Sequence, residues 1–263
     1  MRIYSNAYEL MSETGRNLIE MGTVVKPKTY QNKVIEGKDD YSTREIICEQ
    51  YCLTKLPDPD WLFVYTKAKD WADEEFEERI SGHCINPGTA YLKRRDMWDE
   101  FLVIQKDGTK KFDYTYPERI NALVEIPGNH NDITTKLEAI ITLLKYDHDT
   151  RKAVLNIFGS DANRNHIDSD YYDGSHRIPC SMYYDFLIRN DSKGVPQLNI
   201  CYHQRSSDFI GHFGDDVYLA WRLMEYVAKK VGVKPGYLFH TIDSLHTYKK
   251  DWWMLNTSID DIH

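Results

Sequence analysis

Apolar residues recur along the chain with two different periods, which predict both helices and strands. Spacings of three and four residues predict helices over residues 5–21 and 133–144 and from Asp216 to Val231. Runs rich in β-branched and aromatic residues predict strands over residues 152–158, 182–188 and 198–202. Gly232 follows the last helical stripe and is expected to end that helix.

The two strands over residues 182–188 and 198–202 are separated by a turn sequence, Asn190-Asp191-Ser192-Lys193-Gly194. Cys180 lies just before the first strand and Arg205 just after the second. Antiparallel pairing would therefore bring the cysteine and the arginine together.

The remaining segments are less regular. Residues 23–30 contain β-branched residues broken by Pro27, which predicts a strand or an exposed loop. Residues 55–131 mix proline, glycine and acidic runs, which indicates short helices and loops packed on a sheet. Residues 160–176 are polar and predict a loop that leads to Cys180.

Composition indicates one globular domain over residues 1–263, with 41% hydrophobic and 28% charged residues. The net charge of −8 and the pI near 5.7 argue against a nucleic-acid-binding protein. A small phosphorylated ligand needs only a local cluster of Arg and Lys, so this charge does not exclude it.

The five cysteines form an odd set, and the sequence shows no leader peptide and no apolar run long enough to span a membrane. We therefore expect a cytoplasmic protein with reduced thiols. Cys48 and Cys52 would share one face of a helix, but no second pair of ligands has zinc-site spacing, so no metal is expected. We interpret Cys48, Cys52, Cys84 and Cys201 as small buried hydrophobes.

Four short motifs in the C-terminal third suggest a nucleotide-modifying site. In order they are Pro179-Cys180, Gln204-Arg205-Ser206-Ser207-Asp208, Asp215-Asp216 and Ser244-Leu245-His246-Thr247-Tyr248. A cysteine can attack an electron-poor carbon, an arginine can hold a phosphate with two hydrogen bonds, and a His and a Tyr can bind a sugar hydroxyl.

This ordered set resembles the thymidylate synthase family, most clearly over residues 133–250. The resemblance implies an α/β (α+β) fold with a mixed, largely antiparallel central sheet flanked by helices, and a homodimer formed through that sheet. Within the family the chain is most similar to the phage-type deoxycytidylate (dCMP) hydroxymethylases, enzymes of phage DNA modification. Ser244 and Asp216 stand where thymidylate synthases have an aspartate and the asparagine that reads the base.

The hydrogen-bonding groups of the two bases indicate, independently of the family, what an aspartate at this position would recognise. Uracil presents a C4 carbonyl and an N3–H, which an amide side chain matches. Cytosine presents a C4 amine and a bare N3, so a carboxyl group can accept from the amine and share a proton with N3. We prefer Asp216 as the base reader, because it lies eleven positions after Arg205 as in the family, and assign Asp215 to capping the helix.

The resemblance also implies the reaction. The Cys180 thiolate would add to C6 of the pyrimidine, and 5,10-methylenetetrahydrofolate would supply the one-carbon unit. Capture by water gives a hydroxymethyl group and capture by hydride gives a methyl group, so dCMP methylase, thymidylate synthase and dUMP hydroxymethylase are the alternatives. The short stretch after Tyr248 favours water, because less of the chain is left to close over the folate. An inactive binding protein that keeps the fold is a further alternative, disfavoured by Cys180, Arg205 and His246.

The remaining site residues follow from the same resemblance. We expect Arg205 and Ser206 to bind the phosphate, and His246 and Tyr248 the sugar. Asp208 and Gly211 fall where the family contacts the folate pterin, and Asp208 is also expected beside the nucleotide. The other residues expected at the site are Arg151 and Lys152, which would reach the partner's phosphate, Lys28 or Lys26 as an N-terminal phosphate residue, Glu45 as the glutamate that orders water, and Trp71 as the folate-stacking ring.

Overall fold

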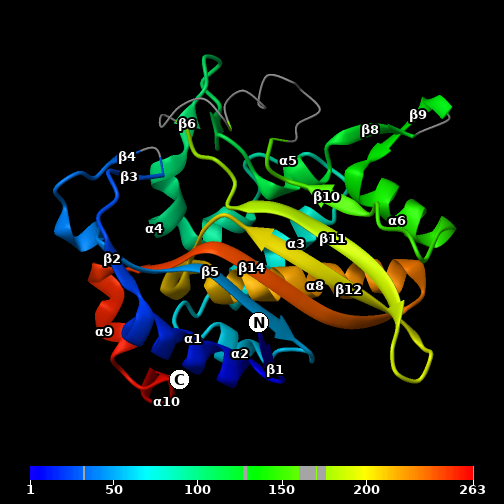
Figure 1. Cartoon of the computed structure of the whole chain (residues 1–263). Coiled ribbons are helices and arrows are strands. Elements are labelled where there is room, and N and C mark those ends of the chain that lie inside the picture. The colour runs from blue at the N-terminus through cyan, green and yellow to red at the C-terminus, as the bar shows by residue number, and fades with distance from the viewer. Residues whose placement is uncertain (32, 127–128, 160–169, 171–175, 263) are drawn as a thin grey trace.

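The computed structural model describes residues 1–31, 33–126, 129–159, 170 and 176–262. One eight-stranded sheet runs through this part of the chain, with helices packed against it (Figure 1). Its main path is β1 (Arg2–Tyr4), β5 (Thr43–Leu53), β14 (Lys234–Tyr248), β12 (Pro196–Gln204), β11 (Ser181–Asn190) and β10 (Val154–Asn156), with β2 (Thr23–Val25) on β5 and β13 (Ser207–Asp208) on β14.

The sheet is mixed, as the resemblance implies. β5 pairs antiparallel with β14 and β2, and β11 pairs antiparallel with β10 and β12. β14 runs parallel to β12 and β13, and β1 runs parallel to β5. Parallel neighbours join segments far apart in the chain, and this brings Arg205, at the end of β12, beside β14.

Four longer helices cover the sheet and one another: α1 (Ala7–Met21), α3 (Lys69–Arg79), α6 (Lys136–Tyr146) and α8 (Gly214–Val231). α8 packs on β12 and β14, α1 on β5, and α3 on α8. The buried stripe of α8 includes Val217, Ala220, Trp221, Met224 and Val227. These side chains join a single hydrophobic core with those of the sheet.

The shorter elements lie mostly between Pro59 and Thr135 and at the C-terminus. They are α2 (Pro59–Leu62), α4 (Arg95–Trp98), α5 (Tyr116–Ile120), α9 (Trp252–Leu255), α10 (Ile259–Ile262), the 3₁₀ helices at Asp39–Tyr41, Ala90–Arg94, Asp99–Phe101 and Lys249–Asp251, a π-helical turn at Phe209–Phe213, and the strand pairs β3 (Thr29–Tyr30) with β4 (Lys33–Val34), β6 (Val103–Ile104) with β7 (Lys110–Lys111), and β8 (Leu123–Ile126) with β9 (Asn129–Thr135). The expectation of short helices and loops over residues 55–131 is therefore confirmed, with small strand pairs added.

Most predicted elements are present, with shifted ends. The helix expected over residues 133–144 begins at Lys136, because residues 129–135 form β9 and the Thr135 side chain caps the helix by accepting from the Glu138 amide. The helix expected from Asp216 begins at Gly214, directly after the π-helical turn. Cys48 and Cys52 lie on strand β5, so the helical spacing considered for them is wrong.

The β11–β12 hairpin brings Cys180 and Arg205 together as predicted. Ser181 is opposite Gln204, and the Arg205 amide donates to the Cys180 carbonyl at 2.9 Å. The turn closes through the Gly194 amide, which donates to Asp191, and Gly194 has a φ of 78°, which glycine adopts without strain. The loop expected over residues 160–176 lies almost wholly outside the described residues.

Candidate active site

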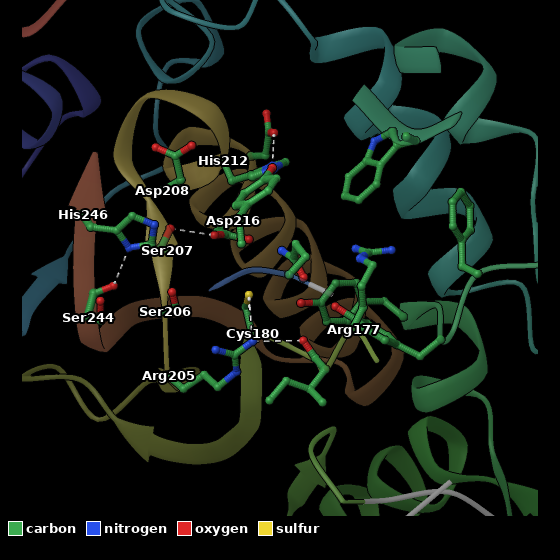
Figure 2. Close-up of a pocket in the computed structure, with 18 of the residues that line it drawn as sticks. Arg177, Cys180, Arg205, Ser206, Ser207, Asp208, His212, Asp216, Ser244 and His246 are labelled. Carbon is green, nitrogen blue, oxygen red and sulfur yellow. Dashed lines mark hydrogen bonds and ion pairs between the residues drawn. The ribbon is translucent and has the colours of Figure 1, made fainter. Parts of the chain in front are cut away.

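A cavity of about 450 Å³ opens between the end of the hairpin, helix α3 and the segments that precede β6 and α5. This volume suits a small-molecule ligand. Nine of the residues expected at the site line it: Glu45, Trp71, Cys180, Arg205, Ser206, Asp208, Asp216, His246 and Tyr248. Figure 2 shows Cys180 between Arg205 and Asp216, with Ser206, Ser207 and His246 to one side.

Four expected residues do not line the cavity. The Lys28 side chain is 78% exposed and forms an ion pair with Glu36 at 3.3 Å. Arg151 and Lys152 are exposed just before β10, outside the cavity. Gly211 does not line the cavity, and a Cβ atom there would lie 2.5 Å from a carboxylate oxygen of Asp208, so a larger side chain would require Asp208 to shift.

Arg205 fixes the backbone on the N-terminal side of Cys180. Its Nε donates to the Pro179 carbonyl at 2.8 Å and one terminal nitrogen donates to the Ile178 carbonyl at 3.1 Å. The same nitrogen lies 3.8 Å from the Cys180 sulfur. Burial raises the pKa of the Cys180 thiol, while Arg205 opposes that shift. The free site therefore holds mostly thiol, and a nearby positive charge favours the thiolate when it forms.

Asp216 is a carboxyl group with a raised pKa in the same cavity. The Ser207 hydroxyl donates to it at 2.9 Å. Burial raises the pKa of Asp216 to about 6, and hydrogen bonding only partly offsets this. The group therefore titrates close to neutral pH, as a residue that shares a proton with a ligand must.

Asp215 does not cap helix α8, so that part of the sequence interpretation is wrong. Its carboxylate is buried and accepts from Arg94 at 2.6 Å, with His212 at 3.4 Å. The helix follows directly on the π-helical turn, and no side chain caps its first residues. Asp215 is thus paired with a cation, whereas Asp216 forms no ion pair among the residues that the structure describes.

A buried chain of hydrogen bonds lies beneath Asp216. The Tyr51 hydroxyl is 2.7 Å from Nδ1 of His240, and Nε2 of His240 is 2.8 Å from the Gln204 side-chain oxygen. Burial lowers the pKa of His240 to about 3, so its ring is neutral. The Tyr51 hydroxyl donates to Nδ1 of His240, so the ring hydrogen is on Nε2. Nε2 then donates to the Gln204 side-chain oxygen, and the Gln204 side-chain nitrogen points away from His240. Among the described residues that nitrogen has no hydrogen bond of ordinary geometry, yet Gln204 lies close enough to Asp216 to lower its pKa.

Helix α3 contributes a face that the sequence analysis did not identify beyond Trp71. Glu75, Glu78 and Arg79 line the cavity with it, at spacings of four, seven and eight residues. Glu75 accepts from Arg79 at 2.9 Å, and burial raises the pKa of the Glu75 carboxyl. The helical repeat from Trp71 was the signal that could have indicated Glu75.

Glu45 lies on β5 directly opposite His246 of β14. It is half-buried and forms no ion pair among the described side chains. Both glutamates border the cavity, and burial raises the pKa of the Glu75 carboxyl. Glu75 is therefore a candidate for proton transfer beside the expected Glu45.

Aromatic rings form the wall on the α4 side of the cavity. Trp98 stacks on Trp71 with ring centroids 6.2 Å apart and contacts Phe101 and Phe112 at the same distance. The sequence analysis expected only Trp71 as an aromatic ring at the site and did not identify Trp98. On the opposite side, the rings of His246 and Tyr248 meet edge to face at 5.2 Å, and burial keeps the Tyr248 phenol protonated by raising its pKa.

Comparison with known sequences agrees with the family resemblance expected from the residues of the site. The sequence model of the family described as Thymidylate synthase matches residues 86–261. The chain belongs to the thymidylate synthase family. The family resemblance expected from Cys180, Arg205 and His246 is thus confirmed, and the match covers two thirds of the chain.

Individual relatives agree on the family and differ in activity. A putative thymidylate synthase of Methanosarcina mazei is 29% identical over 187 residues, which span 68% of this chain and 76% of that protein. A deoxyuridylate hydroxymethyltransferase of Pseudomonas phage M6 is 30% identical over 116 residues, 44% of this chain and 30% of that protein. Together with the family match, these relatives indicate a one-carbon transferase.

The fold agrees as well. Thermostable thymidylate synthase A from Bacillus subtilis superposes with a TM-score of 0.65 at 14% sequence identity, covering 97% of this chain and 84% of that one. Among the described residues, no helix is both long and apolar enough to cross a membrane. The described residues contain no group of three or more His, Cys, Asp or Glu side chains that could hold a metal ion.

Proposed function

We propose that the chain transfers a one-carbon unit to C5 of dCMP and releases 5-hydroxymethyl-dCMP. The observation that supports this most is Asp216, a carboxyl group with a pKa of about 6 in the cavity that also holds Cys180. At pH 7 roughly a tenth of such groups are protonated, so the group can either accept from the cytosine amine or share a proton with N3.

The Cys180 thiolate adds to C6 of the base, and the proton shared between Asp216 and N3 makes C6 more electrophilic. Arg205 has one terminal nitrogen that donates to no described carbonyl, and with Ser206 it is placed to bind the phosphate. His246 and Tyr248 present polar groups toward the sugar. Glu75 is the acid–base candidate for the proton at C5, with Glu45 as the second candidate.

The cavity fits a folate. Trp71 and Trp98 form an aromatic wall of the cavity, and a buried oxygen of Asp208 has no hydrogen-bond partner among the described residues, as expected of an acceptor that awaits a ring N–H. When bound, 5,10-methylenetetrahydrofolate supplies the one-carbon unit. Trp98 and Trp71 would line the wall beside its ring, and Asp208 would orient the ring.

A homodimer is part of the proposal. Arg151 and Lys152 lie outside the cavity of their own chain, so they complete a phosphate site only across an interface. Exposed aromatic side chains on the sheet, Tyr183 and Tyr237, support an interface through that surface.

One alternative substrate has specific support. The phage relatives are described as deoxyuridylate hydroxymethyltransferases, which favours dUMP. The environment of Asp216 favours dCMP, because an ionisable group matches cytosine better than uracil. Methylation of dCMP differs from the proposal in the last step, and thymidylate synthesis differs in both the last step and the base.

Product analysis separates these reactions. The purified chain is incubated with equal dCMP and dUMP and with methylenetetrahydrofolate, and the nucleotides are identified by mass spectrometry. We expect 5-hydroxymethyl-dCMP, and its formation should be lost in Cys180→Ser. Methyl-dCMP would overturn the capture by water, and modification of dUMP alone would overturn the base assignment.

A further inference from the structure

His212 lines the cavity from the π-helical turn that precedes α8, a kind of turn that is frequent at functional sites. Its ring packs against Trp98, with ring centroids 5.7 Å apart. It also lies near Asp216, because burial raises the pKa of that carboxyl and His212 partly opposes the shift. Figure 2 shows His212 beside Asp216, on the side of Cys180 away from Arg205. The ring therefore borders both the aromatic wall and the proposed base reader.

A buried carboxylate lies behind the His212 ring. Nδ1 of the ring is 3.4 Å from Oδ2 of Asp215, three residues further along the chain. The same oxygen accepts from Arg94 at 2.6 Å. Asp215 is only 1% exposed, and its other oxygen, Oδ1, has no hydrogen-bond partner among the described residues. The carboxylate therefore keeps an acceptor for an imidazole N–H while Arg94 holds it in place.

This contact determines which nitrogen of His212 is available to a ligand. With Nδ1 toward Asp215, the ring hydrogen is on Nδ1, and the lone pair of Nε2 points away from the carboxylate. Within the described part of the chain, Nε2 makes no hydrogen bond. A histidine held by a carboxylate at one nitrogen can take a proton at the other, and the carboxylate then stabilises the imidazolium.

The other two histidines of the cavity lack such a carboxylate. His176 is 49% exposed at its side chain and lies 3.7 Å from Asp113, whose side chain is 14% exposed. Nδ1 of His246 lies 3.4 Å from the backbone carbonyl of Ser244. Among the described histidines that line the cavity, His212 alone pairs with a fully buried carboxylate.

We propose that His212 is the general base of the last step and takes a proton from the water that captures the one-carbon group. Asp215 is then a positioning residue, which orients the ring. The inference rests on the proposed function, because it names the residue that activates the capturing water. The transferred carbon has to pass from the donor to C5 of the base, and His212 borders both Trp98 of the donor wall and Asp216.

The step needs no oxidant and no reductant. Once the donor has left, C5 of the base carries an exocyclic methylene, and C6 is bonded to the Cys180 sulfur. The water oxygen bonds to the methylene carbon while one water proton moves to Nε2 of His212. The electron pair of the exocyclic double bond moves to C5 and then forms the C5–C6 double bond, and the C6–S bond breaks to release the Cys180 thiolate. The imidazolium of His212 then returns its proton through solvent.

Two exchange reactions that need no folate test this role, both followed by mass spectrometry. In water labelled with heavy oxygen, the chain should exchange the hydroxyl oxygen of 5-hydroxymethyl-dCMP, because the last step in reverse releases that oxygen as water. In heavy water, it should exchange the hydrogen on C5 of dCMP, which requires the addition of Cys180 but no exocyclic methylene. Asparagine keeps an N–H for Asp215 but is not a base. His212→Asn should therefore lower the oxygen exchange by about 100-fold or more and change the hydrogen exchange by less than about threefold.

His83→Asn is the matched control, because His83 is exposed and does not line the cavity, and it should keep both exchanges. Unchanged oxygen exchange in His212→Asn would overturn the inference, as would an equal loss of both exchanges. A wild-type chain that exchanges the C5 hydrogen but not the hydroxyl oxygen would overturn the inference and leave the addition of Cys180 standing. A wild-type chain that exchanges neither would contradict the proposed function itself.

Discussion

Replacing Asp216 by asparagine should make the protein more stable at neutral pH. Burial raises the pKa of this carboxyl from its ordinary value of 3.8 to about 6 in the folded state. A raised carboxyl pKa means that folding favours the protonated form, so this stabilising contribution is complete below about pH 4 and is lost as the pH rises through 6. Each pKa unit corresponds to 1.36 kcal/mol, so ionised Asp216 costs about 3 kcal/mol above pH 7.

Asparagine does not titrate, and its side-chain oxygen can still accept from Ser207. Urea unfolding of the wild-type chain and Asp216→Asn, in steps between pH 4 and 7.5, should therefore show a stability difference that grows by about 3 kcal/mol in favour of the variant. Because the difference is taken at each pH, groups common to both proteins, such as His240, cancel. A difference that does not change with pH would refute the reasoning.

The neighbouring aspartate provides a control of opposite sign. Asp215→Asn removes the partner of Arg94 and leaves that cation buried. Breaking a buried ion pair from one side typically costs about 3 kcal/mol or more. The same urea measurement at pH 7.5 should thus show Asp215→Asn less stable than the wild-type chain and Asp216→Asn more stable.

Three further outcomes follow from the site. Because burial raises the pKa of Cys180, its alkylation rate by iodoacetamide should still be rising above pH 9, and a plateau below pH 8 would contradict this. Glu75→Gln should lower kcat by about 100-fold or more with little change in dCMP affinity, and Glu45→Gln should lower kcat less. A larger loss of kcat in Glu45→Gln would assign the acid–base role to Glu45. His240→Phe should destabilise the fold by about 2–4 kcal/mol in urea unfolding at pH 7, since it leaves the buried Gln204 oxygen and the Tyr51 hydroxyl without partners, and an unchanged midpoint would argue against the hydrogen-bond chain.

Local sequence patterns predicted the hairpin beside Cys180. Alternating residues and a glycine-containing turn define both strands, and their pairing fixes Cys180 against Arg205 without distant contributions. The role of Asp215 could not be predicted in this way. Its partner, Arg94, lies 121 positions earlier in the chain, so the local pattern showed only an acidic residue at the start of a helix.

The same limit explains Trp98. Its aromatic surroundings are assembled from separate segments, around residues 71, 98–101 and 112, and no local periodicity links them. Glu75 is different, because its four-residue spacing from Trp71 was visible in the sequence. The expectation for Glu45 rests on a match of single residues to the family, whereas Glu75 follows from the face of one helix.

The central claim is that Asp216 selects cytosine, and the ratio of kcat/KM for dCMP to that for dUMP measures it most directly. The wild-type chain should prefer dCMP by about 100-fold or more, because the wrong base leaves buried polar groups unpaired. In Asp216→Asn the ratio should fall and move toward dUMP. A ratio that is the same in both proteins would contradict the assignment of Asp216 as the base reader.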